Sequence, residues 1–103
     1  MPKKSATFTM KETMVLWQTE GTAWHFLPVT LECGKEIKER YGKNRSGFGS
    51  LPVEVTIGGT KWKTSIFPDK QSGSYILPIK ASVRRAEDIE AGEGVEFSIK
   101  VVK

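Results

Sequence analysis

The sequence contains one short motif twice, fifty residues apart, and both copies stand at the same place in a strand–helix unit. Phe26-Leu27-Pro28-Val29 precedes one helical pattern, and Ile76-Leu77-Pro78-Ile79 precedes a second. Proline cannot donate a backbone hydrogen bond to a neighbouring strand, so each Leu-Pro step is expected to end a strand and lead into a helix. Two such halves, roughly 5–50 and 51–103, predict one shared core in a closed or nearly closed β-barrel with a helix at each end.

The segments around the repeat alternate apolar and polar residues, which is the period of a strand that buries one face. The alternation is regular at 53–57 and 95–101, and Gly58-Gly59 joins the first of these to 60–66 as a hairpin. Shorter runs predict further strands at 6–10, 14–17 and 23–27. The fold class is therefore mainly β.

Two short helices interrupt the strands. Thr30 is placed to cap the first helix, whose apolar face repeats every four residues at Cys33, Ile37 and Tyr41 before Gly42 ends it. The second helix is expected to start near Ala81 and to end before Gly92.

Composition limits the class of protein. A chain of 103 residues with 38% hydrophobic and 27% charged residues is expected to form a single globular domain over 1–103, not a disordered segment. The lone Cys33 cannot form an internal disulfide, and no apolar run approaches the roughly 20 residues of a membrane span. The first residues lack the apolar stretch of a signal peptide, so we expect a cytoplasmic protein with no membrane partner.

Three longer runs carry a resemblance to a known family: residues 47–68, 75–86 and 23–28. Together they resemble the bacterial domain-of-unknown-function family 1905, over roughly residues 5 to 102. The resemblance implies a double-split β-barrel, here built as a pseudo-barrel from two related strand–helix halves in one chain. It implies no particular activity.

The stretch 76–86, with 89–95 after it, is also distantly similar to the swapped-hairpin regulators of the AbrB/MazE type. Those regulators need two chains to complete a DNA-binding barrel, whereas the repeat here predicts that one chain supplies both halves. We therefore expect a monomer, with a dimer as the alternative. The first half has Val29-Thr30-Leu31-Glu32 where the second has Ile79-Lys80-Ala81-Ser82, so the similarity does not imply a symmetric DNA surface.

Basic residues mark a candidate anion-binding site. Sixteen Lys and Arg against twelve Asp and Glu give a net charge of +4, a balance that suits nucleic acid or another polyanion. The candidate residues are Lys80, Arg84 and Arg85 at the second helix, and Lys43 and Arg45 in the loop after the first. The alternative is an ordinary solvated helix face whose bases pair with Glu87 and Asp88.

The glycine-rich stretch Gly47-Phe48-Gly49-Ser50 lies in the same loop. It lacks the Lys-Ser/Thr ending of a P-loop. It is either a nest of backbone amides for an anion or a loop whose glycines supply positive φ.

The second candidate function, after anion binding, is a small-molecule binder whose pocket opens between the barrel end and the first helix, lined by Trp24, His25 and Trp62. The tryptophans have packing in the core as their alternative role, and Lys61 and Lys63 flank Trp62. An enzyme is the third class, and its one candidate pair is Cys33 with His25. With a single histidine and no paired cysteines, the sequence predicts no metal site, no cofactor and no catalytic constellation.

Overall fold

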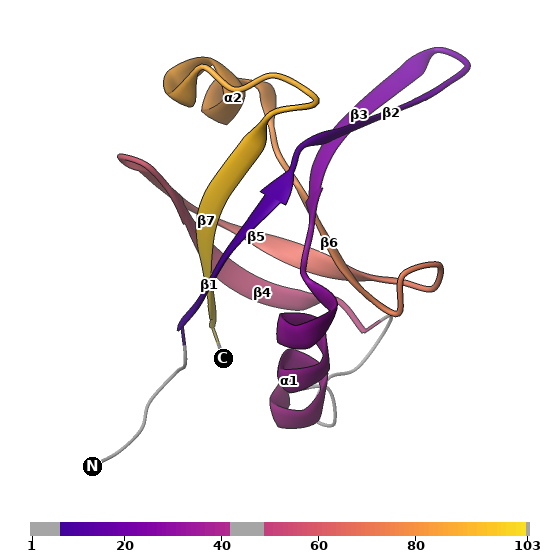
Figure 1. The fold of residues 1–103 in the computed structure, drawn as a ribbon, viewed down its shortest axis with the longest axis vertical. Coiled ribbons are helices and arrows are strands. Elements are labelled where there is room, and N and C mark those ends of the chain that lie inside the picture. The colour runs from indigo at the N-terminus through magenta and orange to yellow at the C-terminus, as the bar shows by residue number, and fades with distance from the viewer. Residues whose placement is uncertain (1–6, 42–48, 103) are drawn as a thin grey trace.

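The computed structural model describes residues 7–41 and 49–102, as seven strands and two helices (Figure 1). In chain order these are β1 (Thr7–Thr13), β2 (Val15–Thr19), β3 (Thr22–Pro28), α1 (Leu31–Tyr41), β4 (Leu51–Ile57), β5 (Thr60–Asp69), β6 (Ser74–Pro78), α2 (Ala81–Glu87) and β7 (Gly94–Val101). The mainly β fold class with two helices is confirmed. No helix in the described part of the chain is long and apolar enough to cross a membrane.

The strands form one sheet in the order β1-β7-β4-β5-β6-β3-β2, and the sheet curls into a half-barrel (Figure 1). β5 makes the bend, because it pairs with β4 over Thr60–Ile66 and with β6 over Phe67–Asp69. The alternating residues of β4 and β7 point inward and are buried, as their sequence pattern predicted.

The curl stops short of a closed barrel. Within the described residues no ladder joins β1 to β2, which lie at the two ends of the sheet. The chain leaves β1 at Met14, whose buried backbone exchanges hydrogen bonds with Glu93 and Gly92 at 2.9 Å each. β2 then pairs with β3 in a hairpin arm that projects beyond the rest of the sheet (Figure 1).

The two Leu-Pro segments pair with one another. In the antiparallel register of β3 and β6, Leu27 lies opposite Leu77, and both side chains are fully buried. On either side the Val29 amide donates to the Tyr75 carbonyl, and the Ile79 amide donates to the His25 carbonyl, each at 2.9 Å. Val29 and Ile79 are fifty residues apart, and so are His25 and Tyr75, so the repeat relates each of these bonds to the other. The repeat thus corresponds to a local pseudo-two-fold relation between the halves.

Both helices start at the corresponding position, one residue after Thr30 and one after Lys80. Thr30 caps α1 as expected, because its hydroxyl oxygen accepts a hydrogen bond from the Cys33 amide at 3.2 Å. The Lys80 side chain makes no such cap, and α2 ends at Asp88, which adopts a left-handed conformation with φ 55°.

Candidate anion-binding site

A basic pocket of about 330 Å³ opens where β6 stops while its neighbouring strands continue. β6 ends at Pro78, which lies opposite Phe26 in the register. Beyond that point β3 pairs only with β2, and β5 pairs only with β4. The slot between β3 and β5 is closed at one end by the chain entering α2. The residues that line this basic pocket are Ala23, Trp24, His25, Trp62, Lys63, Thr64, Pro78, Ile79, Lys80 and Arg84.

The backbone of Ile79 links the two sides of the basic pocket. Its amide donates to the His25 carbonyl of β3 at 2.9 Å. Its carbonyl accepts a hydrogen bond of 3.4 Å from Nε of the half-buried Arg84 on α2. Arg84 is therefore held beside β3 through Nε, and this bond does not use the terminal nitrogens of its guanidinium group.

The lining carries three cations and no carboxylate. Within the described residues, no carboxylate oxygen lies within 4.0 Å of a side-chain nitrogen of Lys63, Lys80 or Arg84; the ion pair present is Arg40 with Glu36 on α1, at 3.0 Å. Glu87 instead accepts a hydrogen bond from the Thr60 hydroxyl. The alternative in which the α2 bases pair with Glu87 and Asp88 is thus not what this structure contains.

The pKa of the His25 imidazole reflects its burial and the positive charge nearby. Burial lowers the pKa of His25 below 6.5, and the nearby positive charge of Arg84 lowers it further. The ring is therefore neutral near pH 7, with one nitrogen able to donate and the other able to accept a hydrogen bond.

The repeat explains why the described residues form no equivalent pocket between α1 and β6. Subtracting fifty from Arg84 gives Gly34, and adding fifty to Trp24 gives Ser74. At that equivalent place α1 lies so close to β6 that a Cβ at Gly34 would collide with the Ser74 side chain, whose hydroxyl donates to the Thr30 carbonyl at 3.2 Å. The small residues Gly34 and Ser74 let α1 pack closely against β6, whereas the larger Trp24 and Arg84 line an open pocket beside α2.

The structure brings together five of the residues singled out from the sequence, namely Trp24, His25, Trp62, Lys80 and Arg84. The candidate pocket and part of the candidate anion site are thus one place. The prediction that this pocket opens beside the first helix is wrong, because its lining includes Arg84 of α2 and no residue of α1. Arg85 is exposed on α2 and does not line it. Lys43, Arg45, Gly47 and Phe48 lie outside the described residues. Of the glycine-rich stretch the structure describes Gly49, with φ 88°, and the half-buried Ser50.

Lys63 is a lining residue that sequence reasoning set aside. Strand alternation puts it on the face opposite Trp62, which led away from a joint role. Because β5 has no partner on its β6 side at this point, the open edge of the strand contributes Trp62, Lys63 and Thr64 to the same slot. The sequence signal that could have identified Lys63 is the run Lys61-Trp62-Lys63.

The three tryptophans differ in the exposed fraction of their side chains. Trp62 is half-buried and packs against the core, whereas Trp17 and Trp24 are 58% and 51% exposed. Cys33 also packs against the core and does not line the basic pocket with His25.

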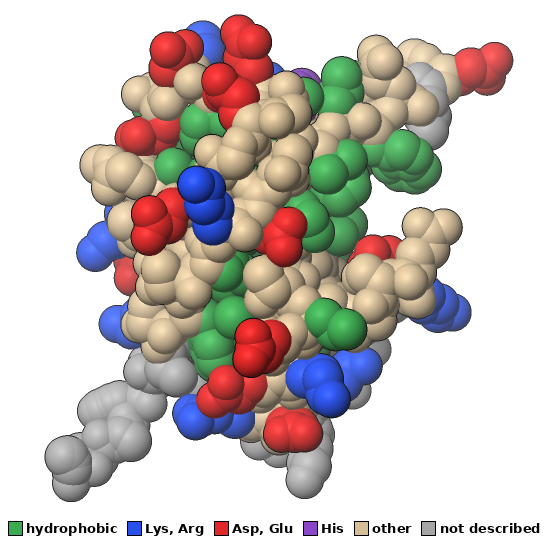
Figure 2. All heavy atoms as spheres, in the orientation of Figure 1, with side chains coloured by type: hydrophobic (Ala, Val, Ile, Leu, Met, Phe, Trp, Pro, Cys, Tyr) green, Lys and Arg blue, Asp and Glu red, His purple; other side chains and the backbone are tan. Residues whose placement is uncertain are grey.

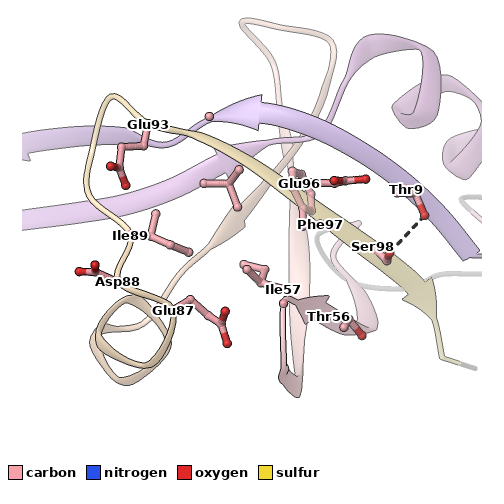
Figure 3. Close-up of a pocket in the computed structure, with 13 residues that line it drawn as sticks. Thr9, Thr56, Ile57, Glu87, Asp88, Ile89, Glu93, Glu96, Phe97 and Ser98 are labelled. Carbon is pink, nitrogen blue, oxygen red and sulfur yellow. Dashed lines mark hydrogen bonds between the residues drawn. The ribbon is translucent and has the colours of Figure 1, made fainter.

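A second, larger pocket of about 790 Å³ lies on the other side of α2, between α2, β4 and β7 (Figure 3). It is acidic, with Glu87, Asp88, Glu93 and Glu96 among its lining residues. Two of these carboxylates have structural partners: Glu87 is bonded to Thr60, and Glu93 accepts a 2.9 Å bond from the Glu90 amide. In the described part of the chain no group of three or more His, Cys, Asp or Glu side chains could hold a metal ion. The smaller basic pocket is therefore the stronger candidate site.

Comparison with known proteins places the chain in a family without giving it an activity. No curated protein matches it. The comparisons do not confirm the similarity to the AbrB/MazE-type regulators. Residues 13–99 match the model described as Domain of unknown function (DUF1905), which covers most of the chain and every element that forms the basic pocket. The protein therefore belongs to the DUF1905 family.

Proposed function

We propose that this protein is a binding module for an anionic partner, which places a negatively charged group in the basic pocket. The observation that carries the proposal is the lining: Lys63, Lys80 and Arg84 converge on one slot that contains no carboxylate. Cations held close together repel one another, and an anion between them relieves that repulsion.

The roles of the three cations follow from their chemistry. Arg84 is oriented by its Nε–H bond to the Ile79 carbonyl, so its terminal N–H groups can grip two oxygens of a phosphate or carboxylate. Lys63 and Lys80 are exposed and supply point charges at the mouth. The neutral His25 ring adds a hydrogen bond of either sense.

We propose binding and not catalysis. Among the lining residues no thiol or carboxylate accompanies His25, and within the described residues no hydrogen bond joins its ring to the Thr64 hydroxyl, so the slot holds no assembled nucleophile–base pair. An anion bound there would be held and not transformed.

Nucleic acid is the polyanion against which to test the proposal, together with inorganic phosphate as a small anion. A pocket of about 330 Å³ is within the usual range of small-molecule sites, which favours the small-molecule binder as the second candidate. The sole histidine reports directly on the site, so titration is followed by the His25 imidazole signals in proton NMR, with single-stranded DNA, duplex DNA and phosphate as separate ligands.

Arg84→Gln is expected to weaken anion binding about tenfold or more, since a charge-assisted hydrogen bond contributes about 1.5–3 kcal/mol. Arg85→Gln is the matched control: it removes the same charge from the same helix, but outside the pocket lining. Binding that weakens equally in both variants, or no binding by any of the three ligands at about 50 mM salt, would contradict the proposal, because phosphate contacts strengthen as salt falls.

A further inference from the structure

An apolar groove of about 290 Å³ adjoins the basic pocket on the outer face of the sheet. It crosses four neighbouring strands, β5, β6, β3 and β2. Its residues lie opposite one another in the strand registers: Phe67 with Ile76, Phe26 with Pro78, and Trp17 with Trp24. All six side chains are apolar.

The groove is not part of the core. Residues next to these on the same strands, such as Leu27, Ile66 and Leu77, point to the inner face and are fully buried. The groove residues Trp17, Trp24 and Phe67 are instead 58%, 51% and 42% exposed. Figure 2 shows hydrophobic side chains on this side of the molecule, between the β2–β3 arm and the β5–β6 turn. Contiguous exposed aromatic surface of this kind usually marks a binding site.

The groove and the basic pocket are neighbours, because Trp24 and Pro78 line both. One molecule lying across Trp24 can therefore have its charge among Lys63, Lys80 and Arg84 and its body against Trp17 and Phe67. The two compartments are complementary to two parts of one ligand, an anionic part and an apolar part.

We infer that the ligand is a small amphipathic anion, with one phosphate, sulfonate or carboxylate group attached to a flat apolar ring system. This inference rests on the proposed function, since it assumes that the charged group enters the basic pocket. A flat ring can stack on the cross-strand pair of Trp17 and Trp24. A nucleobase is less well matched, because apart from indole N–H groups the lining side chains offer nothing to pair with its hydrogen-bonding edge.

The test compares two phosphate probes, one without and one with an apolar body: inorganic phosphate and 2-naphthyl phosphate. Both are titrated into the whole protein and followed through the His25 NMR signals. 2-Naphthyl phosphate is expected to bind about tenfold or more tightly than phosphate, because its ring can stack on the exposed indole side chains. Trp17→Ala and Phe67→Ala should each remove most of that advantage and leave phosphate binding unchanged.

Leu16→Ala is the matched control. Leu16 is the neighbour of Trp17 on the same edge strand, is 40% exposed, and does not line the groove. Its loss should leave the affinity for both probes unchanged. Unaltered phosphate binding in each variant also shows that the variant is folded, because the basic pocket needs β3, β5 and α2 in place.

The possible failures are distinct. If phosphate binds in an Arg84-dependent way but the naphthyl group adds no affinity, the groove inference is wrong and the proposed function stands. If neither probe binds, the inference is wrong, and the proposed function fails as well unless DNA binds in an Arg84-dependent way. Oligonucleotide binding that depends on Trp17 more strongly than naphthyl phosphate binding does would identify a nucleic acid as the occupant. A dimer in sedimentation that Trp17→Ala dissociates would identify a second copy of the chain. Either of these last two results overturns the inference.

Discussion

At the scale of the residue, His25 couples the site to pH. Its pKa lies below 6.5 because of burial first and Arg84 second. Arg84→Gln should therefore raise the pKa measured by NMR, but not fully to 6.5, because the burial remains. A bound anion should raise it as well, so the affinity for sulfate, which does not titrate in this range, should increase as pH falls from 8 to 6. His25→Gln should remove that dependence, measured by calorimetric titration because the variant lacks the NMR reporter.

The effect on stability has the opposite direction. The unfolded imidazole, with a pKa near 6.5, binds a proton more readily than the folded one. The contribution of neutral His25 is thus fully present above pH of about 6.5 and is lost as pH falls through the folded-state pKa. Denaturant unfolding of wild type and His25→Gln across pH 5 to 8 measures it. A variant that loses stability with acid as steeply as wild type would show that other groups cause the loss.

At the scale of the element, the contact of α1 with β6 depends on Gly34. In an exposed helix interior, replacing glycine with alanine usually stabilises by up to about 1 kcal/mol. Here the added Cβ would collide with Ser74, so Gly34→Ala should destabilise the protein by about 1–3 kcal/mol. Chemical denaturation measures the change. The exposed neighbour Lys35→Ala should alter stability by no more than about 0.5 kcal/mol. Stabilisation by Gly34→Ala would mean that α1 can move away from β6 without loss.

At the scale of the whole molecule, the halves interlock through β3 with β6 and through β1 with β7. The protein should therefore unfold in one cooperative transition, with the same midpoint by circular dichroism and by tryptophan fluorescence. Leu27→Ala and Leu77→Ala should each cost about 2–5 kcal/mol, because each leaves a cavity at the centre of the β3–β6 pairing. Both should shift the two probes together. Separate transitions for the two probes would show that the halves fold independently.

Much of this whole-molecule plan could be predicted from the sequence, because local rules determine it. Pro28 and Pro78 end strands, Thr30 caps a helix, and the alternation of β4 and β7 sets the buried face. The half-open curl could not be predicted, because it depends on how far β2 and β3 run past β6. Lys63 and Trp17 were not among the candidates for the same reason: they line a pocket or groove where strands lose a partner, and strand lengths are a tertiary property.

The sealed end at Gly34 and the open end at Arg84 give the fold a division of labour. In protein design, the Gly34 end can be left unchanged to maintain the fold, and the Arg84 end can be varied as the candidate binding site. Exchanging the side chains at positions 24, 63 and 84 should change which ligand binds, while the Gly34 end maintains the fold. Building the same pocket at the Gly34 end would require α1 to move away from β6, since even a Cβ at Gly34 meets the Ser74 side chain.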